Sequence, residues 1–538
     1  MRQEVTRKAD TMQEKIKKTL KHLLGYNDIE ERNIQEKNSV ALDNFLEEHP
    51  LYKEPIHTLG VRPDNKEFSP DIKKITDGFV ILNEDLKKLE DDKIPNIFEY
   101  DGLHSGTPLR YKPFKGALRS IRWTLRRSNL YWYPNAEGSR FDRQKIVDYL
   151  KKEEIITNTS EKKEIGINNV LFTYSTTHAF HLILKALLKD DDVVLMTGPN
   201  YGLFAVKPEI IGNRALVIPL EEEDNFLPNP AKLDKKIKEI NQDLAKKYKG
   251  KEYIPKVKAF LNENPHNPLG KVMSKKDEGL LREIGLVCKN NGVFVIDDLI
   301  YRDLSYKEKA LPMMSIPGLF NNTISLMGIS KAYGLASLRA GLIVGPEEVL
   351  RMLANEIEES LDSMSVLQVA AVTGVFNGSK RREREAKRYL GKILKIYQYR
   401  LSLLEALIYG IDYIKDEKRK KKISYEIDKY IENPEIRNYI KKGIPHLKLR
   451  DNTIPESGFF AIVDFTYFRG KKYNDSVISN DMDFIKFLYK LTKIKIIMGS
   501  NMSWPYEEEI IGRVNFGLDT KALINNFYIM KKALNKLK

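Results

Sequence analysis

The residues best suited to chemistry lie in one short segment, residues 328–341, which reads GISKAYGLASLRAG. Lys331 stands just past a predicted strand, and Arg339 follows it by eight residues, with small residues around both. A lysine amine in such a place can act as a nucleophile or carry a proton, while an arginine binds carboxylates and phosphates. An ordinary surface lysine is the alternative interpretation unless other reactive groups accompany it.

Two other segments carry acid, amide and phenol groups. Residues 264–270 read NPHNPLG, and the two prolines and the glycine favour a fixed turn around Asn267. Residues 293–304 read VFVIDDLIYRDL, which is an apolar strand that ends in two acids and is followed by Tyr301. Acids at the end of a buried strand can serve a site, or they can simply cap the next helix.

Three further segments could bind anions or stack on a ring. Residues 173–179 (TYSTTHA) stand between a predicted strand and an apolar helix, where amides and hydroxyls can bind a phosphate or cap the helix. Residues 199–201 (PNY) offer an aromatic face, and residues 512–517 (GRVNFG) place an arginine in a late strand. Each segment is weak alone, because a structural tyrosine, arginine or helix cap explains it about as well.

In their order along the chain, these segments resemble the motifs of the class I/II aminotransferases, the pyridoxal 5′-phosphate (PLP) enzymes of fold type I in the aspartate aminotransferase superfamily. That family has N-P-x-N-P-x-G, then a strand ending in D-x-x-Y, then S-x-S-K followed by G-x-R-x-G. The D-x-x-Y spacing selects Asp298 rather than Asp297, because Tyr301 follows Asp298 by three residues. The resemblance covers roughly residues 100 to 535 and implies a PLP-dependent transaminase.

The resemblance also implies a role for each residue around the cofactor. Lys331 would form a Schiff base with PLP and later move a proton, and Asp298 would pair with the pyridine nitrogen. Asn267 and Tyr301 would donate to the phenolate oxygen of the cofactor. The remaining cofactor-binding residues that it implies are Thr176, Thr177, Ser330 and Arg339, with Tyr201 stacked on the ring and Tyr133 supplied by a neighbouring subunit.

A substrate site and a second subunit follow from the same resemblance. Arg513 would bind the substrate α-carboxylate, which suits the planar fork of a guanidinium, with Asn267 beside it. Gly106, in HSGTP, is similar to the small residue that lets the substrate approach. Tyr133, in YPNAEG, is similar to a tyrosine that reaches the phosphate of the neighbouring subunit, so we expect a homodimer or higher homo-oligomer. The expected reaction moves an amino group between an amino acid and a 2-oxo acid, without a metal.

The chain departs from the family pattern in several places. Ser175 occupies the usual glycine position of the phosphate segment, and Gly328 stands where many members have a phosphate-binding serine. The first 95 residues match nothing in the family pattern, and there is extra length near residues 410–450. The chain is therefore expected to be a divergent member.

Other reactions and another class of protein stay open. The bond that breaks is the one held perpendicular to the cofactor ring, so an aspartate 4-decarboxylase or a carbon–sulfur lyase is an alternative. A transcription regulator that fuses a winged helix-turn-helix to an aminotransferase-like domain is the alternative from a different class. Residues 1–95, however, show neither a convincing helix–turn–helix glycine turn nor a β-wing.

The elements that must position these residues alternate between strands and helices from about residue 168 to 345. Short β-branched runs bounded by Gly, Pro or Asn predict a largely parallel sheet with strands at 170–174, 193–196, 215–220, 257–261, 293–297, 323–327 and 341–344. Between two of these strands, residues 274–290 have helical spacing with Ser274 as the N-cap. This alternation predicts a layered α/β fold.

The chain is expected to contain three parts. They are a helical N-terminal extension (1–98), a large α/β domain that binds PLP (99–385) and a small C-terminal α+β domain (386–538). Within them we expect helices at 13–24 and 76–89, loops over about 100–140, a long helical stretch over about 346–409, and late strands at 458–464 and 512–517.

Composition excludes several other classes of protein. The 538 residues exceed one ordinary core, and no apolar run approaches the roughly 20 residues that span a bilayer. The N-terminus lacks an apolar signal-peptide core, so a cytoplasmic protein is expected. The single cysteine, Cys288, rules out an intrachain disulfide and is expected to be a packed core thiol. The net charge of +15 is spread among 75 acidic residues, so nucleic-acid binding is not expected.

Overall fold

The computed structural model describes residues 102–106, 111–153, 155 and 165–538. The chain divides into two compact units, Met1–Lys53 and Glu54–Lys538, and all of the described residues belong to the second. The N-terminal extension predicted for residues 1–98, with its helices, therefore lies outside the described residues. No helix in the part of the chain that the structure describes has both the length and the apolar character needed to cross a membrane.

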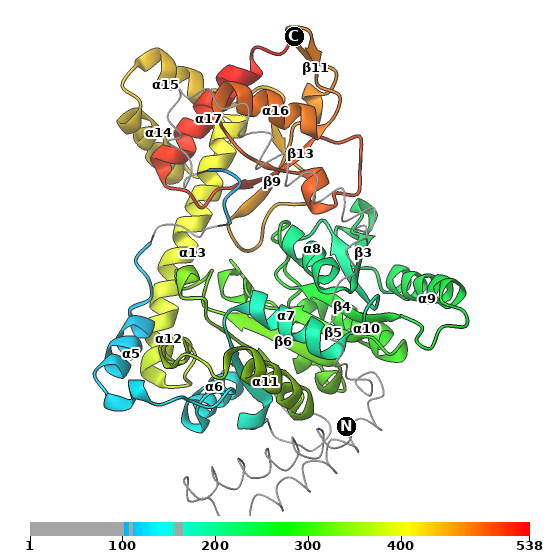
Figure 1. Cartoon of the computed structure of the whole chain (residues 1–538). Coiled ribbons are helices and arrows are strands. Elements are labelled where there is room, and N and C mark those ends of the chain that lie inside the picture. The colour runs from blue at the N-terminus through cyan, green and yellow to red at the C-terminus, as the bar shows by residue number, and fades with distance from the viewer. Residues whose placement is uncertain (1–101, 107–110, 154, 156–164) are drawn as a thin grey trace, which may run out of the picture. The chain divides into compact units, whose positions relative to one another are not determined.

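A central sheet of seven strands has the order β1-β7-β6-β5-β4-β2-β3 (Figure 1). The strands are β1 (Val170–Thr173), β2 (Val193–Gly198), β3 (Arg214–Pro219), β4 (Val257–Glu263), β5 (Phe294–Asp298), β6 (Thr323–Gly328) and β7 (Gly341–Val344). β3, β2, β4, β5 and β6 run parallel, whereas β7 is antiparallel to both β6 and β1. The predicted strands and the largely parallel α/β sheet are confirmed.

Helices on the sheet bury its apolar side chains. α7 (Thr176–Leu187) packs against β6 and β7, while α9 (Pro230–Lys247) and α10 (Glu278–Asn290) pack against β4 and β5. The predicted core thiol of Cys288 is fully buried in the cluster between α10 and the sheet. Ser274 does not cap α10 directly. Its N–H donates to Asp277 at 2.8 Å, which closes a short 3-10 turn leading into that helix.

α5 (Lys115–Leu125) contradicts the prediction of loops over about residues 100–140. It packs closely on α12 (Val366–Val375), because small residues let the two backbones approach. A Cβ added to Gly374 would lie only 2.7 Å from the Cα of Ala117. The Gly-rich composition of this region suggested loops, but here glycine also allows two helices to pack closely. η3 (Ser128–Tyr131) and α6 (Arg140–Lys152) follow α5.

α13 (Lys380–Tyr409) is a helix of 30 residues that contacts both parts of the fold. It packs against α5 and α12 near its start, and against β8 and α17 of the C-terminal region. Together with α11 (Glu347–Leu361) and α12, it confirms the helical stretch predicted to end near Tyr409. The predicted domain boundary between residues 385 and 386 falls inside this helix.

A second, four-stranded sheet has the order β12-β13-β9-β8 and is antiparallel throughout. Its strands are β8 (Lys448–Leu449), β9 (Phe460–Asp464), β12 (Ile497–Met498) and β13 (Ile511–Asn515). The accompanying elements are α14 (Glu417–Tyr430), α15 (Pro434–Lys441), α16 (Asp481–Thr492), α17 (Thr520–Leu534) and the two-stranded ribbon of β10 (Lys472–Tyr473) and β11 (Ser476–Val477). β9 and β13 confirm the two predicted late strands. The second of them carries Arg513.

Candidate active site

The candidate site lies at the edge where the parallel strands end. β4, β5 and β6 end at Glu263, Asp298 and Gly328, and the strands are neighbours in the sheet. Asn267, Tyr301 and Lys331 follow these three ends within a few residues. Because the carboxyl ends of parallel strands meet at one edge, polar residues far apart in the sequence are brought together there.

Lys331 projects into this edge from the loop after β6. Its Nζ donates to the carbonyl oxygen of Gly106 at 2.8 Å, and the side chain is partly buried. Burial, together with the charge of Arg513, lowers the pKa of Lys331 to about 8. A lowered pKa leaves more of the amine neutral near neutral pH, which is the form that attacks a carbonyl carbon. A Cβ on Gly106 would lie 3.8 Å from Nζ, so Gly106 borders this amine.

Asp298 supplies a buried carboxyl beside Lys331. Its Oδ1 accepts the N–H of Ile300 at 3.0 Å. Burial, together with the charge of Asp297, raises its pKa to about 7. No ion pair joins Asp298 to a cation among the described residues, and a cation placed beside it would lower this pKa again. The carboxyl is thus suited to receive a protonated ring nitrogen.

Asp297 has a different environment, although it is the adjacent residue. Its Oδ1 accepts from Asn262 Nδ2 at 2.8 Å and its Oδ2 accepts the N–H of Met313 at 2.9 Å. The side chain is fully buried and engaged with the protein itself. The D-x-x-Y spacing therefore points to Asp298, whose carboxyl accepts fewer hydrogen bonds from the protein than that of Asp297.

Arg513 brings a guanidinium from β13 to the same place. Nη1 donates to Asn267 Oδ1 at 3.4 Å, and Nη2 donates to the carbonyl oxygen of His104 at 2.9 Å. The guanidinium lies 4.1 Å from the centroid of the Phe460 ring, and burial lowers its pKa. Its Nε has no hydrogen-bond partner, and no carboxylate pairs with Arg513 among the described residues. A buried cation of this kind is prepared for an incoming carboxylate.

Tyr301 and Tyr201 flank these groups. Tyr301 is buried edge-on against Phe459 and Phe460, and burial raises its pKa well above the usual value. Tyr201 precedes α8 (Gly202–Ile211) and is 37% exposed, so part of its ring faces open space. Burial also raises the pKa of Tyr201, which is opposed by the nearby charges of Arg513 and Arg339.

The opposite end of the site is formed by the start of α7. Thr176 and Thr177 are the first residues of that helix, where backbone N–H groups lack helical partners. Arg339 Nη2 donates to Ser175 Oγ at 2.9 Å, so the predicted arginine reaches this helix start. Ser330, next to Lys331, is buried.

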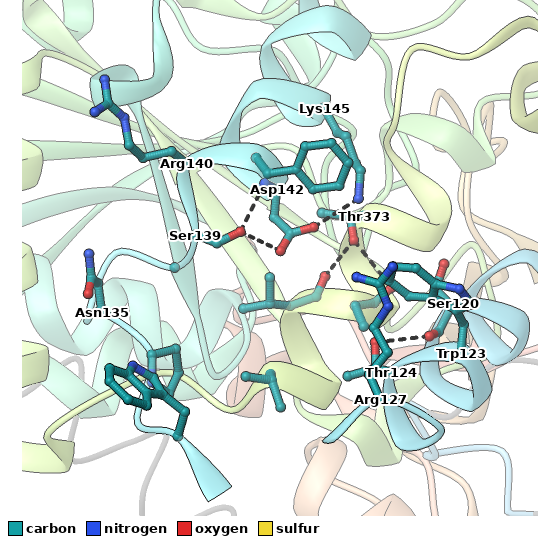
Figure 2. Close-up of a pocket in the computed structure, with 17 residues that line it drawn as sticks. Ser120, Trp123, Thr124, Arg127, Asn135, Ser139, Arg140, Asp142, Lys145 and Thr373 are labelled. Carbon is teal, nitrogen blue, oxygen red and sulfur yellow. Dashed lines mark hydrogen bonds and ion pairs between the residues drawn. The ribbon is translucent and has the colours of Figure 1, made fainter. Parts of the chain in front are cut away.

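Tyr133 is far more exposed than most of the predicted site residues. Its side chain is 78% exposed, and Tyr131, Trp132 and Phe141 close to it in sequence are also exposed. A separate pocket of about 570 Å³ lies in this region (Figure 2). Residues of α5, α6 and α12 line it, and the guanidinium of Arg127 lies 3.5 Å from the centroid of the Trp123 ring. A side chain that acts in a neighbouring subunit must be exposed on its own chain, and Tyr133 meets this requirement.

Sequence reasoning missed Glu263, the last residue of β4. Glu263 is buried and stands opposite Asp298 in the register of the two strands. Its carboxyl accepts the N–H of Tyr201, and burial raises its pKa well above the usual value, with Asp298 adding to the rise. A charged residue at the end of an otherwise apolar strand was the signal that could have revealed it.

The residues present fit PLP. An amine of lowered pKa, a buried carboxyl without a cation, a buried guanidinium without a carboxylate and a helix start beside an arginine are the donors that this cofactor needs. The unpaired Nε of Arg513 shows that the protein's own groups leave an unsatisfied buried donor here.

Comparison with known families gives the same class. Residues 105–419 match the family described as "Aminotransferase class I and II". Because this match covers more than half of the chain, the chain belongs to that family, whose enzymes are PLP-dependent transaminases.

Individual relatives are distant. The chain is 27% identical to the aspartate aminotransferase of Pyrococcus abyssi over 43% of this chain and 53% of that protein. It is 26% identical to the histidinol-phosphate aminotransferase of Thermoanaerobacter pseudethanolicus over 61% of this chain and 87% of that protein. The first of these matches thus spans about half the length of the relative.

Solved structures share the fold. The aspartate aminotransferase of Rhizobium meliloti aligns with a TM-score of 0.64 and 16% identity, covering 90% of this chain and 100% of that chain. A Thermus thermophilus aspartate aminotransferase solved with maleate aligns with a TM-score of 0.61 and 14% identity, covering 89% and 100%. At this identity the likeness establishes fold type I and no more.

Proposed function

We propose that this protein moves an amino group between an amino acid and a 2-oxo acid, with PLP joined covalently to Lys331. The observation that carries the proposal is the combination of three groups: the Lys331 amine, the buried Asp298 carboxyl without an ion pair and the buried Arg513 guanidinium without a carboxylate partner among the described residues. The charges of Asp298 and Arg513 act on the pKa of Lys331 in opposite directions, which supports a shared electrostatic environment for the three groups.

The cofactor would be held by residues at both ends of the site. Asp298 would face the ring nitrogen, Asn267 and Tyr301 the phenolate oxygen, and Tyr201 the ring. The phosphate end would be formed by Thr176, Thr177, Ser330 and Arg339. When bound, PLP supplies an electron sink that makes a bond to the amino-acid Cα easier to break.

The protein's own groups then have distinct tasks. Arg513 binds the α-carboxylate through its two-pronged guanidinium and so fixes the orientation of Cα. The free Lys331 amine can take the proton from the substrate Cα and deliver it to another atom of the substrate–cofactor pair. Its pKa of about 8 is close to working pH, so it can both accept and donate a proton. Gly106 leaves space beside this amine for the substrate.

A second copy of the chain is part of the proposal. Tyr133 and the neighbouring rings are exposed in one chain, which costs free energy that burial in a homodimer would recover. In such a dimer Tyr133 would reach the phosphate end of the partner's site. Small amino acids and 2-oxo acids are the proposed ligands of each site.

The test is a panel of single amino acids offered to the full-length, PLP-loaded protein with a 2-oxo acid acceptor. We expect a 2-oxo acid to form from at least one amino acid, without stoichiometric release of CO₂ or sulfide. Release of CO₂ or sulfide instead would assign the site to decarboxylation or elimination. Lys251→Ala, at an exposed lysine, is the matched control for Lys331→Ala.

A further inference from the structure

Ser175 has a backbone conformation that serine rarely adopts. It precedes α7 with φ 98° and ψ 165°, whereas glycine is the residue that reaches positive φ without steric cost. Strain of this kind persists only where the surrounding structure holds it, and it gathers at functional sites. The contacts of the Ser175 hydroxyl therefore bear on function.

The Ser175 hydroxyl is buried and is used twice as an acceptor. Arg339 Nη2 donates to Oγ at 2.9 Å, and the N–H of His178 donates to it at 3.4 Å. A hydroxyl has one proton to donate and two lone pairs to accept with. Both lone pairs are engaged, and no acceptor takes the proton of Ser175 among the described residues. The structure thus leaves a buried hydroxyl proton available to an acceptor from outside the chain.

Arg339 also lacks an acidic partner. Its Nη1 donates to the carbonyl oxygen of Ala336 at 2.9 Å, and no ion pair with a carboxylate is formed within the described residues. The guanidinium, the Ser175 hydroxyl and the first amides of α7 are therefore adjacent donors at one place. Donors of this number and charge suit a phosphate dianion.

The end of β6 on the other side carries no hydroxyl, because residue 328 is glycine. Gly328 ends β6, and a Cβ added there would lie 2.7 Å from Ile300 Cδ1 and 3.4 Å from Thr176 Cγ2. A serine at position 328 would need Ile300 to move. The hydroxyl of Ser175, just before α7, can donate to a phosphate in its place.

From this geometry we propose that Ser175 is a ligand of the cofactor phosphate and holds Arg339 in place for it, an inference that rests on the proposed function. The hydroxyl donates its proton to a phosphate oxygen while it keeps accepting from Arg339. Glycine would relieve the backbone strain but would remove this donor. The serine therefore supplies a phosphate donor that glycine lacks, although its backbone is strained.

The test compares Ser175→Gly and Ser175→Ala in the full-length protein after removal of PLP. Binding of PLP and of unphosphorylated pyridoxal is followed by absorbance, and binding of inorganic phosphate by calorimetry. Both variants should bind PLP and phosphate about 10-fold more weakly, because one hydrogen bond to a charged group is lost. Affinity for pyridoxal should not change. Ser337→Ala, at an exposed serine of the Arg339 loop, is the matched control and should bind all three ligands normally.

The melting temperatures of the two variants distinguish loss of backbone strain from general destabilisation of the fold. Without ligand, Ser175→Gly should melt no lower than the wild type, whereas Ser175→Ala keeps the strain, loses the cap and should melt lower. Unchanged PLP affinity in Ser175→Gly, or an equal loss for PLP and pyridoxal, would overturn the inference. A wild-type chain that binds no PLP would overturn the proposed function instead.

Discussion

The two ends of the candidate site are built in different ways. At the end that would face the cofactor ring, Asn267, Asp298 and Arg513 are buried and come from strands or from the turn just after a strand. At the phosphate end, Arg339 is exposed and Ser175 is strained. One end is fixed by the sheets, and the other depends on a helix start and a loop.

This contrast separates chemistry from cofactor retention. Rigid, desolvated groups at the ring end can act on reacting atoms, because burial already shifts their pKa values. The phosphate end, where Arg339 is exposed, would hold or release the cofactor. Substitutions at the ring end should thus change turnover, and substitutions at the phosphate end should change cofactor affinity.

The largest effect is expected at Lys331. Lys331→Ala removes the nucleophile and the proton carrier together, so the rate of 2-oxo acid formation should fall by at least about 10³-fold. Single-turnover measurement with excess protein detects the residual rate. Lys251→Ala should keep the wild-type rate, and an active Lys331→Ala protein would contradict the account of the ring end.

The next effect distinguishes two adjacent acids. Asp298→Asn should lower kcat by roughly 10²-fold, because it removes the charge proposed to face the ring nitrogen. Asp297→Asn should instead lower the stability of the fold by about 1–3 kcal/mol, since Asp297 accepts from Asn262 and the N–H of Met313. Steady-state kinetics and thermal melting separate the two outcomes. The reverse pattern would assign the ring-facing role to Asp297.

Arg513→Lys should affect substrate binding more than the cofactor. A lysine keeps the charge but loses the two-pronged geometry, so KM for the amino acid should rise about 10- to 100-fold. Affinity for PLP should stay close to that of the wild type. A variant that loses PLP but keeps its KM would show that Arg513 serves the cofactor.

The pH dependence of cofactor uptake gives a smaller and sharper test. Only the neutral amine attacks the aldehyde, and the pKa of Lys331 is lowered to about 8, so uptake should speed up as pH rises through about 8 and then level off. Arg513 lowers this pKa, so Arg513→Gln should move the midpoint to higher pH. Stopped-flow absorbance measures it, and a midpoint that moves down would contradict the proposed arrangement.

Glu263→Gln should have the smallest effect. Burial raises the pKa of Glu263 well above its usual value, which favours the neutral carboxyl, and a glutamine resembles that form. The rate of 2-oxo acid formation at pH 7 should change by no more than about 3-fold. A much larger loss would show that Glu263 acts as a charged group beside Asp298.

Much of this architecture follows from local sequence signals. The strands of the central sheet were predictable because each is a short β-branched run that ends at a turn residue. The D-x-x-Y spacing predicts Asp298 rather than Asp297 as the site acid, and the mutations above test that choice. α5 was missed because its glycine serves a helix contact that only the partner helix reveals. The strain at Ser175 and the register of Glu263 opposite Asp298 depend on tertiary placement, which spacing does not encode.

The most direct test of the central claim is to reduce the PLP-loaded, full-length protein with borohydride and map the modified peptide by mass spectrometry. The account predicts one phosphopyridoxyl group, on Lys331, with no other lysine labelled in proportion to the cofactor. Stoichiometric labelling of a different lysine, or a protein that retains no PLP, would contradict it.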